Sequence, residues 1–295
     1  MRYRGGRKLQ QYILSSFISE GGGGNKAAVV FDNLGLSCQQ MLEIAKKNNF
    51  SETAFIDFKN SEENKFSIRY FTPTEEVDIC GHAALASFQV LKQLGYLKEK
   101  TAYHLTKAGE LKVLLEVDKI LIEMERPEVI MQLTIETIMK ATDLYKTNII
   151  AGKNALVDVI STGLKDIILE VDGIETLKNM NILKEEMIEI CKQYELVGMH
   201  VVSRETIGHD SDFCCRNFAP AVGIDEESAT GTSNASLLYY IIRNSNNFNY
   251  SKTYRIEQGY FMGSPSNIYA KADKDTGSIF VGGIAKIEKV EDIIL

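Results

Sequence analysis

The chain contains an internal repeat, which restricts its possible folds more than any other feature of the sequence. The segment Lys65–Pro73 matches Asp212–Pro220 at Phe, Arg, Phe and Pro, with the same spacing. The corresponding arginines, Arg69 and Arg216, lie 147 residues apart in a chain of 295 residues. Solenoid repeats recur about every 20–50 residues, so this period is far too long for a solenoid. The sequence therefore predicts two related domains.

Each copy of the repeat leads through a glycine turn into an apolar helix. Gly81 is followed by His82 and then by small and apolar residues, and Gly231 is followed by Thr232 and a similar run. Small or apolar side chains occupy nearly every side of the first turns of both helices, which is typical of helices that are buried all round. We expect a curved sheet to wrap each of them.

Short strand patterns and fewer helical patterns fill the rest of the chain. The predicted helices are Cys38–Asn48 (with Ser37 as its N-cap), His82–Leu94, Thr134–Tyr145, Leu183–Tyr194 and Thr232–Arg243. The predicted strands are Gln11–Phe17, Ala27–Phe31, Thr53–Phe58, Phe66–Phe71, Leu111–Val117, Ile120–Glu125, Leu156–Ile160, Asp166–Val171, His200–Ser203, Phe213–Phe218, Tyr254–Gln258, Asn267–Lys271 and Ile279–Ile287. This mixture predicts an α+β fold.

The two predicted domains divide near Asp118. Residues 1–118 form the N-terminal domain, to which residues 280–295 can return, and residues 119–279 form the C-terminal domain.

The starts of the two buried helices are candidate sites for an anion. The first N–H groups of a helix have no internal partners and carry the positive end of its dipole. A glycine at that place lets an anionic ligand come close to the backbone. Two facing domains of this kind would bind a small carboxylate without Lys or Arg. The alternative is that Gly81 and Gly231 only form tight turns, but the duplication favours the anion site.

Glu52 is the clearest candidate for acid/base chemistry. Alternation along the strand places it on the same face as Ala54 and Ile56. A carboxylate on an apolar face is costly unless it is paired, and desolvation is expected to raise its pKa towards neutrality. A general acid/base needs such a pKa. The alternative is that Glu52 takes the exposed first position of the strand and points to water.

Asp225, Glu226 and Glu227 form an acidic cluster just before the second glycine turn. Acidic residues there complement the helix dipole, which is one interpretation. The other is that one of them is a second proton carrier or binds substrate. His82 also has two interpretations, because it could donate to a substrate or relay a proton, or it could cap and pack the helix.

Composition and motifs exclude several classes of function. The net charge is −7 and basic residues do not cluster beyond Lys8, so we expect no nucleic-acid partner. No apolar run approaches the roughly 18 residues of a membrane span. Five cysteines without CxxC spacing indicate reduced thiols in a cytoplasm. The repeat counterpart of Cys80 is Thr230, so a pair of opposed catalytic thiols is not available. Metal and nucleotide motifs are absent, so we predict no cofactor and no metal site.

Seven stretches carry a resemblance to a known family. In order, from about Gly23 to Lys286, they read GGNKAAVVF, NNFSETAFI, IRYFTPTEEVDICGHAALAS, ISTGL, CRNFAPAVGIDEESATGTS, QGYFMGSPS and VGGIAKI. On these residues the chain resembles the phenazine-biosynthesis-like (PhzF) family, which has the diaminopimelate-epimerase-like fold. The resemblance implies two pseudo-symmetric domains, each a β-barrel-like sheet around a central helix. It also implies a site in the cleft between them, cofactor-free isomerisation by proton transfer, and a homodimer.

The resemblance also implies roles for individual residues. Glu52 matches the catalytic glutamate that takes a proton from one carbon and returns it to another. The implied partners, which contact substrate or line its site, are His82, Glu227, Asn25, Gly81, Gly231 and Thr232. Three motifs depart from the family pattern, at Lys26, at Ser228 and at Ser264. Glu227 itself stands where the family usually has Asp, so the substrate is expected to differ from the phenazine precursor.

Three functional hypotheses follow. The first is an isomerase that shifts a proton and a double bond on a small carboxylate, with Glu52 as base and then acid. The second is a racemase or epimerase of an amino or hydroxy acid that uses Glu52 and Glu227 as a pair. The third is a protein that binds a small ligand without catalysis.

Overall fold

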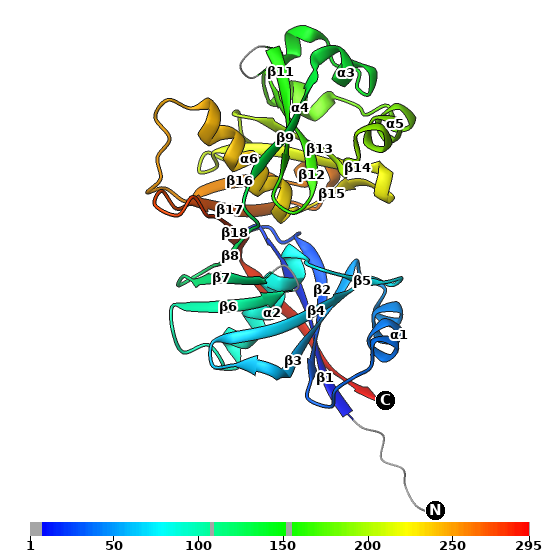
Figure 1. The fold of residues 1–295 in the computed structure, drawn as a ribbon, viewed down its shortest axis with the longest axis vertical. Coiled ribbons are helices and arrows are strands. Elements are labelled where there is room, and N and C mark those ends of the chain that lie inside the picture. The colour runs from blue at the N-terminus through cyan, green and yellow to red at the C-terminus, as the bar shows by residue number, and fades with distance from the viewer. Residues whose placement is uncertain (1–7, 107–108, 152–154, 295) are drawn as a thin grey trace, which may run out of the picture. The chain divides into compact units, whose positions relative to one another are not determined.

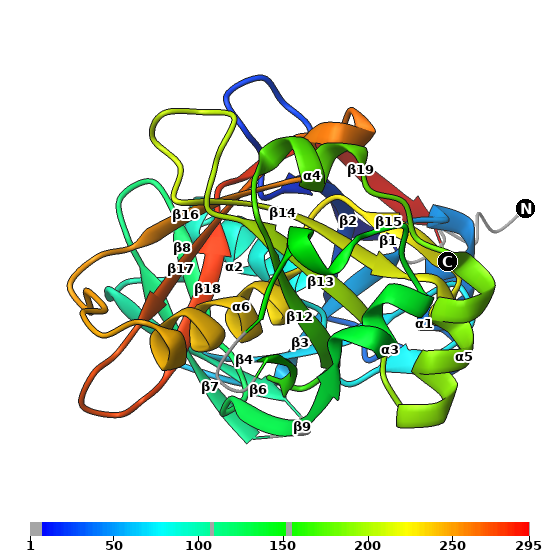
Figure 2. The same ribbon diagram turned by 90° about the horizontal axis from the view of Figure 1, so that it is seen from above.

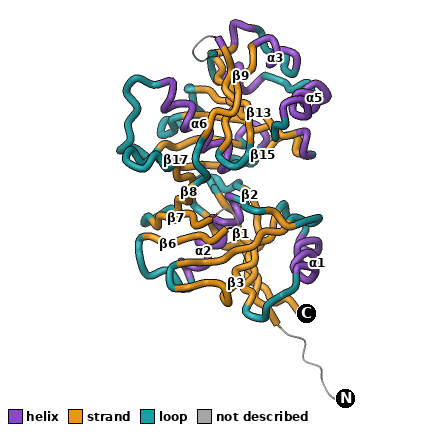
Figure 3. Tube along the Cα trace, in the orientation of Figure 1, coloured by secondary structure: helices purple, strands orange, loops and turns teal. Residues whose placement is uncertain are grey.

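A computed structural model describes residues 8–106, 109–151 and 155–294. The chain divides into two compact units. Unit 1 comprises Asn25–Ile122, together with the N-terminal segment up to Ile18 and the C-terminal segment from Gly282 onwards. Unit 2 comprises Ser19–Gly24 and Glu123–Val281. Strands dominate both units and helices are few (Figure 3), so the fold is mixed α+β, as predicted.

Unit 1 is built from a mixed sheet and two helices (Figure 1). Its strands are β1 (Lys8–Ser16), β2 (Asn25–Asp32), β3 (Glu52–Glu62), β4 (Lys65–Phe71), β5 (Glu76–Val77), β6 (Thr101–Thr106), β7 (Gly109–Leu115), β8 (Ile120–Glu123, which ends at the boundary) and β19 (Ala285–Ile294). The helices are α1 (Cys38–Asn48) and α2 (Gly81–Gln93). The bounds of α1 are those predicted, and Ser37 caps it in a capping box with Gln40.

Helix α2 is buried on nearly every side. It packs against β1, β2, β3, β4 and β19. Leu85, Phe88 and Leu91 are fully buried, and each contributes about 1.5–3 kcal/mol by leaving water. The buried hydroxyl of Ser87 is satisfied because it donates to the carbonyl oxygen of Ala83 at 2.8 Å. The all-round burial predicted from the sequence is confirmed for this helix.

Unit 2 holds the remaining elements. Its strands are β9 (Glu128–Thr134), β10 (Ile149–Ile150), β11 (Leu156–Ser161), β12 (Lys165–Val171), β13 (Gly198–Ser203), β14 (Phe213–Ala219), β15 (Ile224–Glu227), β16 (Tyr254–Gln258), β17 (Ser266–Ala272) and β18 (Ile279–Gly283, which reaches the boundary). Its helices, which are labelled in Figure 2, are α3 (Ile135–Lys140), α4 (Ile174–Asn179), α5 (Lys184–Tyr194) and α6 (Gly231–Asn244). Helix α6 packs against β11, β12, β13 and β17.

The two units share one order of strand pairing. In unit 1 the order is β1, β2, β3, β4, β6, β7, and in unit 2 it is β11, β12, β13, β14, β16, β17. In both, the second strand is parallel to the third and the fourth is parallel to the fifth. The buried helices α2 and α6 each connect the fourth strand to the fifth. The sequence repeat is therefore also a repeat of topology.

One ion pair is duplicated with the topology. Arg69 donates to both carboxylate oxygens of Glu76 at 2.8 Å, and Arg216 donates to those of Glu226 at 3.0 and 2.8 Å. Each pair joins the short strand before the buried helix to the repeat strand, β5 to β4 and β15 to β14. Bidentate geometry of this kind fixes the orientation of both groups.

Three expectations from the sequence differ from the structure. The helix predicted over Thr134–Tyr145 ends at Lys140, because Thr142 leaves the helix to form a β-bridge with Ile182. The strand predicted over Ile279–Ile287 is two strands, β18 and β19, interrupted at Ile284. The short elements α4, β5, β6, β9, β10 and β15 were not predicted. In the part of the chain that the structure describes, no helix combines the length and apolar character of a membrane span.

We expect Gly198→Ala to destabilise unit 2 by about 3 kcal/mol or more. A Cβ at this position would lie 2.1 Å from the carbonyl oxygen of Phe218, a backbone atom of the paired strand β14 that cannot move without breaking the ladder. Gly21→Ala is the control, because its Cβ would meet nothing nearer than 3.9 Å. Chemical denaturation measures both free energies of unfolding, and equal values would show that the contact is not tight.

Candidate active site

Local structure places Glu52 at the start of β3. Helix α1 ends at Asn48, and the left-handed backbone of its C-cap residue Asn49 (φ 54°) turns the chain towards β3. Strand β3 then runs parallel to β2, with Glu52 opposite Ala27. The Glu52 side chain is 19% exposed. It is therefore largely removed from water rather than directed into it.

The start of α2 presents backbone N–H groups that its own side chains do not cap. Cys80 is the N-cap residue, with an extended backbone, and its side chain makes no capping hydrogen bond. No acidic residue lies in the first turn. Gly81 and His82 are the first residues of the helix, so the positive end of its dipole lies beside His82.

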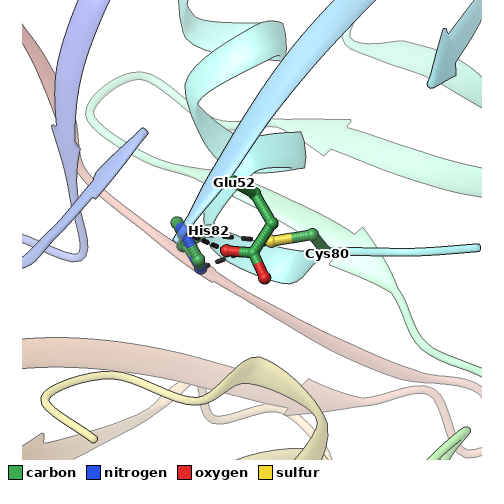
Figure 4. A group of neighbouring side chains, drawn as sticks. All are labelled: Glu52, Cys80 and His82. Atoms are coloured by element: carbon green, nitrogen blue, oxygen red, sulfur yellow. Dashed lines mark hydrogen bonds and ion pairs between the residues drawn. The ribbon is translucent and has the colours of Figure 1, made fainter. Parts of the chain in front are cut away.

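Glu52, Cys80 and His82 converge at this place (Figure 4). Atom Oε2 of Glu52 lies 3.1 Å from Nε2 of His82, and Oγ of Ser51 lies 3.1 Å from the same nitrogen. On the other side of the ring, Nδ1 lies 3.4 Å from Sγ of Cys80 and 3.4 Å from the amide nitrogen of Asn25. His82 is 5% exposed and is the centre of the cluster.

The pKa of Glu52 lies below its ordinary value of 4.5, which corrects the expectation that it is raised. Burial is the largest single influence and does raise it. The hydrogen bond and charge of His82 act in the opposite direction, and so do hydrogen bonds from Ser51 and Cys80. Together they outweigh burial. The expectation was wrong because it treated the carboxylate as unpaired.

The pKa shifts of His82 and Cys80 favour the charged form of the Glu52–His82 pair. Burial lowers the pKa of His82, but Cys80 and the Glu52 carboxylate outweigh it, so the pKa lies well above 6.5. Burial and the charge of Glu52 raise the pKa of the Cys80 thiol above 9.0. These directions favour the paired charges of Glu52 and His82, and they favour the neutral thiol of Cys80.

The same three residues could hold a metal ion. One ligand atom from each of Glu52, Cys80 and His82 lies within 4.8 Å of the others. Two features weigh against this use. The imidazole would first have to release the proton that pairs it with Glu52, and the positive end of α2 disfavours a cation. The arrangement suits a proton and an anionic ligand better.

The structure gathers the predicted site residues into two groups, one in each unit. Asn25, Glu52, Gly81 and His82 come together in unit 1, as described above. Glu227, Thr230, Gly231 and Thr232 lie at the start of α6 in unit 2. The hydroxyl of Thr230 donates to Oε2 of Glu227 at 2.7 Å.

The three residues of the acidic cluster have different partners. Asp225 pairs with Lys184 and Glu226 pairs with Arg216, so both are engaged in ion pairs away from the start of α6. Glu227 is the one that bonds to the N-cap residue of α6, Thr230.

Three polar contacts of these groups were not predicted from the sequence: Ser51, Cys80 and Gln258. Ser51 and Cys80 adjoin residues already singled out, so proximity was the available signal. Gln258 is fully buried and bonds to Thr230 and Glu227 from another strand. Nothing local in the sequence connects it to them.

Comparison with known proteins places the chain in a family. The profile of the phenazine biosynthesis-like proteins matches residues 14–289. An uncharacterised isomerase of Clostridium acetobutylicum is 31% identical over 245 residues, which cover 80% of each chain. A solved PhzF-family protein of Bacillus anthracis has a TM-score of 0.82 at 23% identity and covers 98% of this chain and 100% of its own. A predicted epimerase of Pseudomonas aeruginosa has a TM-score of 0.78 at 19% identity, with 97% and 99% coverage. The chain belongs to the phenazine biosynthesis-like (PhzF) family, which includes proteins named isomerases.

Proposed function

We propose that this protein is an isomerase that moves a proton between two carbons of a small carboxylate, with Glu52 as base and then as acid. The observation that carries the proposal is the buried Glu52–His82 pair beside the uncapped start of α2. The names of the relatives support isomerase activity for the family. Glu227, in unit 2, is proposed as a second acid/base group. We also propose that the sheet of each unit closes into a barrel around its buried helix.

The proposed reaction is balanced without a redox partner. The Glu52 carboxylate removes a proton from a C–H bond, and the electron pair of that bond moves into the adjoining unsaturated system. The double bond shifts, and the protonated Glu52 returns the proton to a different carbon. The substrate is neither oxidised nor reduced, and the enzyme ends in its starting state.

The electrostatics define what each group contributes. A lowered pKa keeps Glu52 ionised at neutral pH but makes it a weaker base. The proton must therefore be acidified by the substrate's own conjugation and by positive charge nearby. The imidazolium of His82 and the first N–H groups of α2 supply that charge.

A panel of unsaturated and amino carboxylates tests the proposal. We expect at least one to raise the melting temperature, and NMR of the mixture to show a positional isomer with no cofactor added. Stabilisation with neither a new product nor a loss of optical activity would favour a binding protein and contradict the proposal. Loss of optical activity from an enantiopure compound would favour the second candidate, a racemase or epimerase. The fold shared with a predicted epimerase supports that candidate.

A further inference from the structure

A buried carboxamide lies beneath the start of α6. Gln258 is the last residue of β16 and is fully buried. Its polar atoms bond to Glu227 at the end of β15, to Thr230 at the N-cap of α6 and to Asn234 within α6. A buried amide is stable only when its donors and acceptors are matched, so the direction of each bond is informative.

Two backbone groups show which end of the Gln258 amide carries the oxygen and which carries the nitrogen. The N–H of Thr230 can only donate, and it lies 3.2 Å from Oε1 of Gln258. The carbonyl oxygen of Glu227 can only accept, and it lies 2.8 Å from Nε2. The side-chain amide of Asn234 also donates to Oε1, at 2.8 Å. The orientation of Gln258 therefore follows from groups whose polarity is not in question.

This orientation sets the direction of the next bond. Nε2 of Gln258 donates to Oγ of Thr230 at 3.0 Å, so the single hydrogen of that hydroxyl remains for another acceptor. The acceptor is Oε2 of Glu227, 2.7 Å away. The carboxyl oxygen that faces Thr230 must therefore accept, as an ionised carboxylate does.

The fold itself does not require this arrangement. The repeat places Cys80 where unit 2 has Thr230, and Val77 where unit 2 has Glu227. Helix α2 nevertheless begins at a glycine in the same way as α6. If the fold required this hydrogen-bond network, the start of α2 would have it too. The network is therefore particular to unit 2.

The charged neighbours of Glu227 are already paired. Asp225 pairs with Lys184, and Glu226 pairs with Arg216 from β14. On β16, Glu257 accepts two backbone N–H groups, at 2.8 and 2.7 Å. Burial raises the pKa of Cys215 on β14 well above its ordinary value, so its thiol is neutral. The charges of these groups are thus engaged elsewhere, whereas the Thr230 hydroxyl donates directly to Glu227.

We propose that Gln258 is a positioning residue that acts through Thr230 to hold the Glu227 carboxylate as a hydrogen-bond acceptor at the start of α6. The inference rests on the proposed acid/base role of Glu227 and deepens it, because it names the residue that sets the orientation of that group. Thr230 transmits the effect.

NMR of protein labelled with carbon-13 at the glutamate carboxyls tests this without a substrate. The signal of Glu227 is assigned by its loss in Glu227→Gln. In Thr230→Val, which removes the hydroxyl, we expect that signal to titrate about one pH unit higher than in wild type. Thr230→Ser keeps the hydroxyl and should titrate within about 0.3 of a pH unit of wild type. An unchanged midpoint in a folded Thr230→Val protein would overturn the proposal.

A second measurement isolates the contribution of Gln258. The NMR signal of the Gln258 side-chain amide proton that faces Thr230 should move upfield in Thr230→Val but not in Thr230→Ser. Only the valine variant loses the hydroxyl that accepts this proton. Gln258→Met keeps the Thr230 hydroxyl but leaves it free to rotate, so it should raise the Glu227 midpoint in the same direction as Thr230→Val but by less. A folded Gln258→Met protein with the wild-type midpoint would overturn the role of Gln258. If Gln258→Met does not fold, the amide proton decides: an unchanged chemical shift of this proton in Thr230→Val would overturn the role of Gln258. Turnover by Glu52 variants is measured separately, so failure here leaves the proposed function standing.

Discussion

In the Glu52→Gln variant we expect turnover to fall by about 10²–10⁴-fold, the usual contribution of a general acid/base. The amide has nearly the shape of the carboxylate but cannot accept a proton from carbon. Because the start of α2 and His82 remain in place, we expect KM to change by less than about threefold. Initial rates on a carboxylate that wild type isomerises provide the measurement.

Glu62→Gln is the matched control for this experiment. Glu62 is an exposed glutamate at the far end of the same strand, β3, whereas Glu52 begins it. Its substitution should leave turnover within about twofold of wild type. Thermal denaturation would show whether either variant is misfolded. Turnover of folded Glu52→Gln equal to that of wild type would remove Glu52 from the mechanism.

In the His82→Gln variant we expect catalysis to become sensitive to mild acid. In wild type the pKa of Glu52 lies below 4.5, so the base stays ionised at all higher pH values. His82 supplies the largest opposition to burial, and a neutral glutamine supplies no charge. Burial then raises the pKa of Glu52, and the acid limb of the rate profile moves to higher pH. We expect the rate at pH 5 to be about tenfold below that at pH 7 in the variant, against less than about twofold in wild type.

The alkaline side of the profile follows from the opposite shift. The pKa of His82 is raised well above 6.5, so the ion pair persists through neutral pH and is lost as His82 releases its proton at higher pH. His104→Gln is the control, because His104 is also buried in unit 1 but bonds to Tyr70 outside the cluster, at 2.8 Å. An acid limb that is equal in His82→Gln and wild type would show that the pair does not set the ionisation of Glu52.

The repeat made the topology accessible from sequence. Lys65–Pro73 and Asp212–Pro220 identified two corresponding strands, and the glycine turns that follow identified α2 and α6. Periodicity and a capping residue were enough for α1, because its signals lie within the helix itself. Helix α3 was predicted too long, since contacts with Ile182, forty residues further along the chain, end it. Local patterns carry no information about such contacts.

Glu52 could be located from sequence but its ionisation could not. Strand alternation and the apolar neighbours indicated a buried carboxylate as one of two interpretations, and burial alone predicts a raised pKa. The sign changed because His82 reaches Glu52 from α2, a contact that only the folded chain brings about. The acidic cluster was unresolved for the same reason. The partners of Asp225 and Glu226 are Lys184 and Arg216, which lie on other elements.

Hydrogen exchange at carbon tests most directly whether Glu52 carries a proton during isomerisation. Wild type and Glu52→Gln would be incubated in deuterium oxide with a carboxylate that wild type converts, and product and recovered substrate analysed by NMR and mass spectrometry. Wild type should place deuterium at the carbon that gains a hydrogen in those turnovers in which protonated Glu52 exchanges its proton with solvent, and Glu52→Gln should lose both this incorporation and turnover. Turnover or deuterium incorporation at the wild-type rate in folded Glu52→Gln would contradict the account.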